Sequence, residues 1–130
     1  MTQSDAELLR LGYEDFAAGD VPAVLAVFSE DITWYAPGRN PISGVYTGHD
    51  EVLGLFRSLG ERSAGTFHLD VQEIFDNGDG TVVVLTRELG ERNGAQLDSS
   101  SVHVWKLRDG KVTSFQAFQH DDHAWDEFWA

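Results

Sequence analysis

The sequence has no cysteine, which excludes both a disulfide framework and a cysteine-based metal site. It also lacks a signal peptide and any apolar run long enough to span a bilayer, so we expect a cytoplasmic protein that does not bind membranes. Basic residues are scarce, with 9 lysines and arginines against 22 aspartates and glutamates, and the formal net charge is -13. Because nucleic-acid binding depends on clustered basic side chains, we expect no nucleic-acid partner.

The chain does contain enough apolar residues for one core. Its 130 residues are 42% hydrophobic and 12% aromatic, which suffices for one domain and is too little for two, so we expect a single domain over residues 1–130. The first part is patterned for helices. Ser4 and Glu7 have the spacing of a capping box before a helix over residues 5–18, and Asp20 and Pro22 begin a second short helix that runs through Phe28. A third helix follows His49 and ends near residue 60.

Strand patterns dominate the rest of the chain. A short strand is predicted at residues 32–36, and longer ones at 67–75, 81–89, 97–107 and 112–119, separated by turns rich in Asn, Asp and Gly. Residues 121–129 are predicted to form a terminal helical turn whose tryptophans need burial. Helices followed by antiparallel strands favour an α+β fold, with the helices on one face of a bent sheet.

Three segments carry a resemblance to a known superfamily. FSEDITWYAPG, GHDEVLGLF and VHVWKLRDGKVTSFQAF occur in this order, and with them nearly the whole chain resembles nuclear transport factor 2, ketosteroid isomerase and the SnoaL-like polyketide cyclases. The resemblance implies a cone-shaped α+β barrel, in which a curved antiparallel sheet wraps around the N-terminal helices. It is specific for the fold and weak for chemistry, because this fold hosts enzymes, binding proteins and scaffolds.

The catalytic residues of ketosteroid isomerase do not carry over. In the resembling enzymes an aspartate base precedes the loop proline, and here that position is Ala36. The tyrosine of their oxyanion hole falls on Gly12, next to Tyr13, and the protonated aspartate falls on His103. Since that isomerisation needs a carboxylate base and an acidic donor, we expect a different reaction here.

The resemblance and strand alternation together predict which residues face a ligand inside the cone. Residues 97 to 107 alternate, so Ser101, His103 and Trp105 share one face of the strand. His103 is the predicted general acid or base, because histidine exchanges protons near neutral pH, and Glu88 is its predicted partner. The predicted ligand-binding residues are Tyr13, Trp34, Phe56, Ser101, Trp105, Phe115 and Gln119. Their mixture of apolar walls and few polar groups favours a small hydrophobic ligand and no cofactor or metal.

Each polar candidate also has a structural interpretation. His103 can be a core residue bonded to Ser101 or to a backbone carbonyl, and a glutamate at a strand end such as Glu88 is commonly solvated. His120 to His123 contain two histidines and two aspartates, which can bind zinc or iron, but neighbouring side chains diverge. Asp121 or Asp122 is better explained as the cap of a helix.

Two functions from different classes follow. The first is cofactor-free acid–base chemistry, such as isomerisation, cyclisation or hydration of a hydrophobic carbonyl compound, with His103 as proton shuttle and Ser101 or Gln119 as hydrogen-bond donors. The second is a non-catalytic domain of the same fold that binds a small molecule or dimerises. Val83, Leu85, Val102 and Val104 would form an apolar patch on the outer sheet face, which predicts a homodimer.

Overall fold

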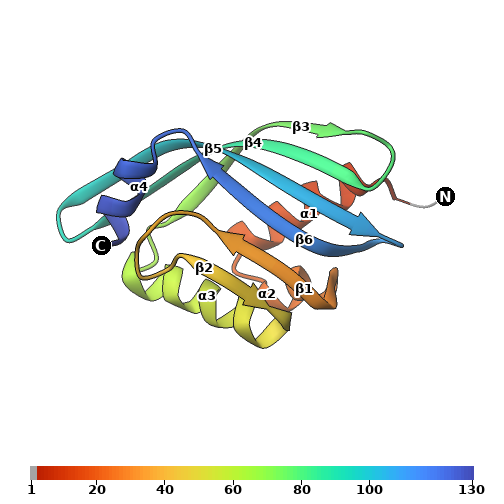
Figure 1. Cartoon of the computed structure of the whole chain (residues 1–130), viewed down its shortest axis with the longest axis horizontal. Helices are drawn as coiled ribbons and strands as arrows, with labels where there is room; N and C mark the ends of the chain where they lie inside the picture. The colour runs from red at the N-terminus through yellow and green to blue at the C-terminus, as the bar shows by residue number, and fades with distance from the viewer. Residues whose placement is uncertain (1–2) are drawn as a thin grey trace.

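The computed structural model of the protein describes residues 3–130, in which helices lie against one face of a curved sheet (Figure 1). The helices are α1 (Asp5–Ala17), α2 (Val21–Ala26), α3 (Gly48–Arg62) and α4 (Asp122–Trp129). The strands are β1 (Phe28–Ala36), β2 (Gly44–Thr47), β3 (His68–Asp76), β4 (Thr81–Arg92), β5 (Ala95–Arg108) and β6 (Lys111–Gln119). They form a six-stranded sheet in the order β2-β1-β6-β5-β4-β3, which confirms the predicted α+β class. No helix among these residues is long and apolar enough to cross a membrane.

The sheet is antiparallel except where β1 joins β6, and these two strands run parallel. Strands β3 to β6 form the predicted meander. The turn between β5 and β6 is made by Asp109 and Gly110, whose φ angles are 52° and 74°. Positive φ at both positions is characteristic of the two-residue type I′ hairpin, which matches the right-handed twist of the strands it connects.

The boundary between α2 and β1 differs from the prediction. Phe28 was expected on the second helix with a strand starting at Ile32, but α2 ends at Ala26 and β1 begins at Phe28. Phe28 pairs with Val112 of β6, and the Val112 backbone N–H donates to Val27 O at 2.8 Å. Pairing with a strand far along the chain therefore outweighs the local helical pattern, and a single sequence does not show that pairing.

Side-chain caps fix the beginnings of three helices. Ser4 Oγ accepts from the backbone N–H of Glu7 at 3.1 Å, which confirms the predicted N-cap of α1. Asp20 caps α2, and Asp121 caps α4. Asp121 is therefore a helix cap, which was the alternative to a metal ligand for this residue. Within residues 3–130 there is no group of three or more His, Cys, Asp or Glu side chains that could hold a metal ion.

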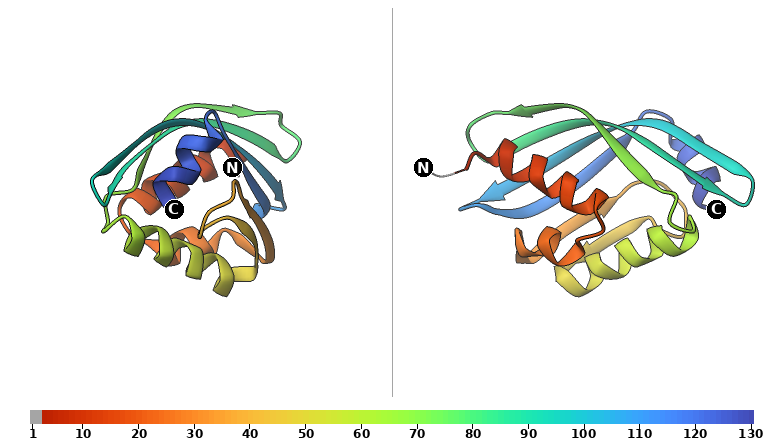
Figure 2. Two further views of the ribbon diagram at one scale, coloured as in Figure 1. Left: turned by 60° about the vertical axis from the view of Figure 1, so that its left-hand side comes forward. Right: turned by 180° about the vertical axis from the view of Figure 1, so that it is seen from behind.

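The helices cover the concave face of the sheet (Figure 2), so that side chains from both meet in one core. α1 packs against β3, and α3 packs against β1 and β2. α4 lies at the end of the sheet near the β4–β5 turn, where Arg92 donates to Phe128 O at 3.3 Å (Figure 1). Along β5 the buried positions alternate and include Ser101, His103 and Trp105, which confirms the predicted inner face.

Candidate functional site

A cavity of about 90 Å³ lies between the helices and the inner face of the sheet. Most of its wall is apolar and aromatic. Trp34 stacks on Phe115 with ring centroids 3.7 Å apart and meets Trp105 edge to face at 5.7 Å. Phe56 of α3 and Trp125 of α4 close the wall from the helical side. Such a surface suits a small organic group better than an ion.

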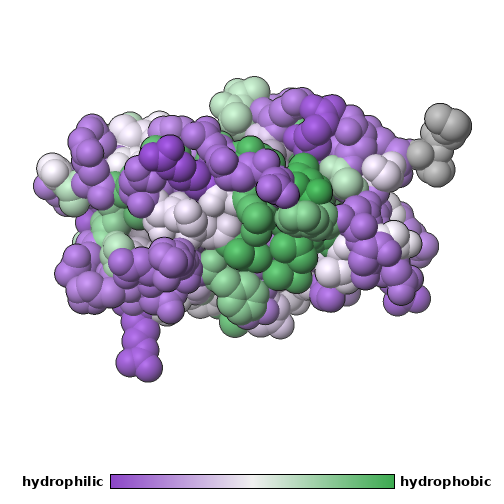
Figure 3. All heavy atoms as spheres, turned by 90° about the horizontal axis from the view of Figure 1, so that it is seen from above, coloured by the Kyte–Doolittle hydropathy of each residue, from purple (hydrophilic) through white to green (hydrophobic). Residues whose placement is uncertain are grey.

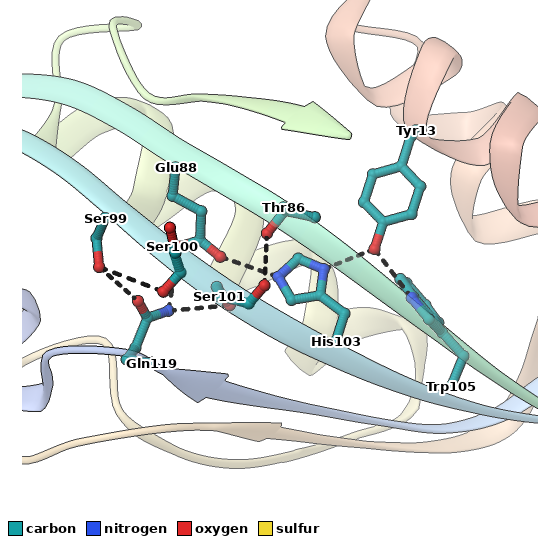
Figure 4. A network of polar contacts seen from close by, with 9 residues as sticks. All are labelled: Tyr13, Thr86, Glu88, Ser99, Ser100, Ser101, His103, Trp105 and Gln119. Carbon is teal, nitrogen blue, oxygen red and sulfur yellow. Dashed lines mark hydrogen bonds and ion pairs between the residues drawn. The ribbon is translucent and has the colours of Figure 1, made fainter. Parts of the chain in front are cut away.

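One wall of the cavity carries a continuous line of hydrogen bonds (Figure 4). The Trp105 indole N–H donates to Tyr13 Oη at 2.9 Å. Tyr13 Oη lies 2.6 Å from His103 Nδ1, and His103 Nε2 lies 2.9 Å from Glu88 Oε1. Tyr13 comes from α1, Glu88 from β4, and the other two residues from β5. The fold therefore assembles this line from three elements that are separate in the sequence.

The chemistry of the end groups sets the direction of the hydrogen bonds. An indole nitrogen only donates, and an ionised carboxylate only accepts. With a neutral imidazole, His103 Nε2–H donates to Glu88, and Nδ1 accepts the proton of the Tyr13 hydroxyl. Every donor then points toward Glu88. This is the order of a Ser-His-Asp triad, with a phenol in place of the serine hydroxyl.

The pairing of β4 with β5 brings Glu88 and His103 within reach. Glu88 is opposite Ser99, and Val84 is opposite His103. These positions are even numbers of residues apart on each strand, so all four side chains face the same side of the sheet. Glu88 and His103 lean toward each other along that face and meet (Figure 4).

Further polar side chains hold Glu88 from its other side. Gln119 Nε2 donates to Glu88 Oε2 at 3.2 Å and to Ser101 Oγ at 3.4 Å. Ser99 Oγ donates to Gln119 Oε1 at 3.3 Å. Both oxygens of Glu88 are therefore occupied, which fixes the carboxylate toward His103 (Figure 4).

Burial governs the protonation of the phenol. It raises the pKa of Tyr13 well above the ordinary value of 10.0; the hydrogen bond from Trp105 lowers this pKa, and the charge of Glu88 raises it. Tyr13 is therefore protonated at neutral pH. Its single proton is donated to His103 Nδ1 while the imidazole is neutral, and it becomes free for a ligand oxygen when Nδ1 itself carries a proton.

The structure places all the predicted site residues except one on the cavity wall. Those that line it are Glu88, His103, Tyr13, Trp34, Phe56, Trp105, Phe115 and Gln119. Ser101 is not among the lining residues, and its Oγ accepts from the Gln119 amide. The alternative of a solvated Glu88 is wrong: β4 continues to Arg92, so Glu88 is inside the strand and buried.

His103 is buried and hydrogen-bonded, as its structural interpretation requires, but its partners are Tyr13 and Glu88 rather than Ser101 or a backbone carbonyl. The positions carried over from ketosteroid isomerase also meet at the cavity, since Gly12, Ala36 and His103 all line it. Ala36 supplies no carboxylate, so that enzyme's base has no counterpart there. Tyr13, beside Gly12, contacts His103 instead.

Sequence reasoning missed that α4 lines the cavity and that it is bonded to the loop after β1. Trp125 and Pro37 line the cavity, and Asp126 Oδ1 accepts from Arg39 N and from Asn40 Nδ2, both at 2.8 Å. The tryptophans near the end of the chain indicated burial but not its location. No local pattern connects α4 with a loop more than eighty residues earlier.

Comparison with known proteins identifies the family of the chain. Residues 9–115 match the family described as SnoaL-like domain. The chain belongs to this family. An uncharacterized protein of Mycobacterium tuberculosis is 28% identical to this SnoaL-like protein over 127 residues, covering 98% of this chain and 97% of the relative. The structure of Bal32a, from a soil-derived mobile gene cassette, is 33% identical with a TM-score of 0.93, covering 96% of this chain and 95% of Bal32a.

Other solved structures extend the comparison. TerC, co-crystallized with polyporic acid, is 25% identical with a TM-score of 0.82, and the match covers 94% of this chain and 95% of TerC. An NTF2-like protein of unknown function from Burkholderia pseudomallei is also similar. These similarities confirm the superfamily that the sequence motifs indicate. The chemistry of this SnoaL-like protein has to be argued from its own side chains.

Proposed function

We propose that this SnoaL-like protein carries out cofactor-free acid–base chemistry, such as isomerisation, cyclisation or hydration, on a small hydrophobic carbonyl compound. The observation that carries the proposal is the buried line from Trp105 through Tyr13 and His103 to Glu88 at the wall of an apolar cavity. A ligand in this cavity meets mostly aromatic and aliphatic surface, so its polar atom is directed to the line. The polyporic acid co-crystallized with TerC supports an organic ligand.

Tyr13 is the member of the line that meets the ligand oxygen, because protein groups already occupy both nitrogens of His103. When the imidazole carries a second proton, its Nδ1–H donates to Tyr13 Oη, and the Tyr13 O–H turns to the carbonyl oxygen. Proton transfer then moves one proton from Tyr13 to the ligand and one from His103 to Tyr13. A neutral imidazole remains beside Glu88, whose negative charge had stabilised the imidazolium.

A second candidate function is ligand binding without catalysis. The two hydrogen bonds of His103 also favour this function. A histidine whose ring nitrogens both have protein partners can simply be a core residue with its polar atoms satisfied. Ala36, where the isomerases have their base, likewise offers no group to take a proton from carbon. Under this function the Tyr13 hydroxyl only orients the ligand.

Binding and turnover of a carbonyl library separate the two functions. Ligands are first found by thermal shift, since binding to the folded state raises its stability. Turnover of those ligands is then compared in wild type, His103→Asn and the exposed control His68→Asn. If His103 relays protons, His103→Asn lowers turnover about 100-fold or more, while the control matches wild type. Ligands that bind without turning over would favour the binding function, and a library without binders would contradict both.

We also propose a homodimer through the outer face of the sheet. Figure 3 looks onto this face, and a hydrophobic area occupies its middle with hydrophilic residues on both sides. Val83, Leu85, Val102 and Val104 are partly exposed on the neighbouring strands β4 and β5. Exposed apolar areas of this kind favour association, because burying them removes apolar surface from water.

A further inference from the structure

Two hollows of the molecule meet where β1 and β6 end. One is the inner cavity of about 90 Å³, and the other is a groove of about 570 Å³ along the outer side of the sheet. The residues that line both are Ala36, Pro37, Ala117 and Gln119. Because the same residues border both spaces, the cavity and the groove lie next to each other at this point.

The pairing between β1 and β6 ends at this point. Their last paired residues are Tyr35 and Gln116, so Ala36 and Ala117 lie beyond the ladder. Both side chains are single methyl groups, so they obstruct the region between the two strand ends less than larger side chains would. Asp126 of α4 holds the neighbouring loop through its two hydrogen bonds, so this region has a fixed border.

The inner cavity alone is too small for most hydrophobic carbonyl compounds. A dry protein cavity of about 150 Å³ holds one benzene molecule, whereas this cavity has about 90 Å³. A carbonyl group with a few carbon atoms fills it. The remainder of a larger ligand has to lie outside, and the groove begins at the same residues.

Building on the proposed function, we propose that the ligand is elongated and uses both spaces. Its carbonyl end lies in the inner cavity at Tyr13, and an uncharged hydrocarbon tail passes between Ala36 and Ala117 into the outer groove. The groove is thus a second subsite that selects the length of the ligand.

The chemistry of the groove fits an uncharged apolar tail. Tyr35, Val45 and Phe118 line it, and all three are large hydrophobic residues exposed on the sheet. The charged residues at its border are Arg39 with Asp122 and Asp126. One arginine and two carboxylates offer no net attraction to an anion, so apolar contact is the main source of affinity.

Straight-chain 2-alkanones from 2-butanone to 2-decanone test the subsite, because they keep one carbonyl end and vary only the tail. Their dissociation constants are measured by NMR titration of the full chain. We expect the affinity to rise with chain length by up to about fourfold for each methylene buried. Phe118→Ser should flatten this rise beyond the shortest ketones and leave the binding of 2-butanone unchanged.

Phe75→Ser is the matched control, because Phe75 is 51% exposed and Phe118 is 50% exposed on the same sheet, and only Phe118 lines the groove. This control should keep the full length dependence. Tyr13→Phe should weaken all the ketones by the same factor.

The outcomes separate this inference from the function on which it rests. If 2-butanone binds and Tyr13→Phe weakens it, but chain length has no effect, the subsite is refuted while the proposed function stands. If no alkanone binds while another compound of the carbonyl library does, the subsite is refuted and the proposed function stands. If Phe118→Ser changes the molar mass in light scattering but leaves the length dependence intact, the groove is a contact between copies of the chain and the subsite is refuted.

Discussion

Arg87 and Glu88 are neighbours on β4, yet each belongs to a polar pair on a different face of the sheet. Arg87 pairs with Asp98 on the outer face, where the two side chains are 50% and 54% exposed. Glu88 pairs with His103 on the inner face, where they are 3% and 5% exposed. Water and salt weaken the outer pair, whereas removing one partner of the inner pair leaves a buried polar group unsatisfied.

The two faces also shift pKa values by different causes. On the outer face the pKa of Asp98 is lowered mainly by its hydrogen bond to Arg87, so the shift depends on the partner residue. On the inner face the pKa of Tyr13 is raised mainly by burial, so the shift depends on the loss of contact with water. One pair of strands thus provides a solvated surface and a site whose proton positions are fixed by the interior.

The largest effect on stability is expected from breaking the inner pair of Glu88 and His103. Glu88→Leu leaves His103 Nε2 and the Gln119 amide without their acceptor. Each buried donor left without an acceptor costs about 1–3 kcal/mol of unfolding free energy. Urea unfolding measures the loss, with Arg87→Leu on the same strand as the control. A similar loss in both variants would show that burial does not distinguish the two faces.

A smaller effect, confined to assembly, is expected on the outer face. Val104→Lys places an ammonium in the proposed dimer contact, and burying an unpaired charge costs several kcal/mol. Light scattering should therefore show a monomer for the variant and a dimer for wild type. Circular dichroism should remain that of the folded chain. A wild-type monomer at micromolar concentration, or a dimeric variant, would rule out this interface.

The smallest effect is a pH dependence caused by Tyr13. Its folded-state pKa is raised, so folded and unfolded chains are both protonated below about pH 10 and stability is unaffected there. Above about pH 10 the unfolded phenol ionises first, and the unfolding free energy falls by about 1.4 kcal/mol per pH unit. Tyr13→Phe should remove this component, measured as the difference between the two proteins at pH 9 and pH 11. Equal losses in both proteins would argue against a buried phenol.

Local sequence predicted much of the fold because the signals involved are local. The Ser4 cap, the Asp109–Gly110 turn and the alternation along β5 each depend on a few neighbouring residues, and each is confirmed. The predicted start of β1 was wrong because the true start depends on pairing with β6. The site was predicted in part. Alternation put His103 on the same face as Ser101 and Trp105, and the family resemblance indicated that this face lies toward the cavity.

The sequence by itself determined an acidic chain without cysteine, the order of the helices and the long strands, and the side of β5 that carries the polar residues of the site. Only the tertiary structure decided what those residues do. Tyr13 and His103 are 90 residues apart, and no periodicity relates a side chain on α1 to one on β5. Their hydrogen bond forms because the sheet curves around the helices, and burial in the resulting core gives the phenol, the imidazole and the carboxylate their fixed order.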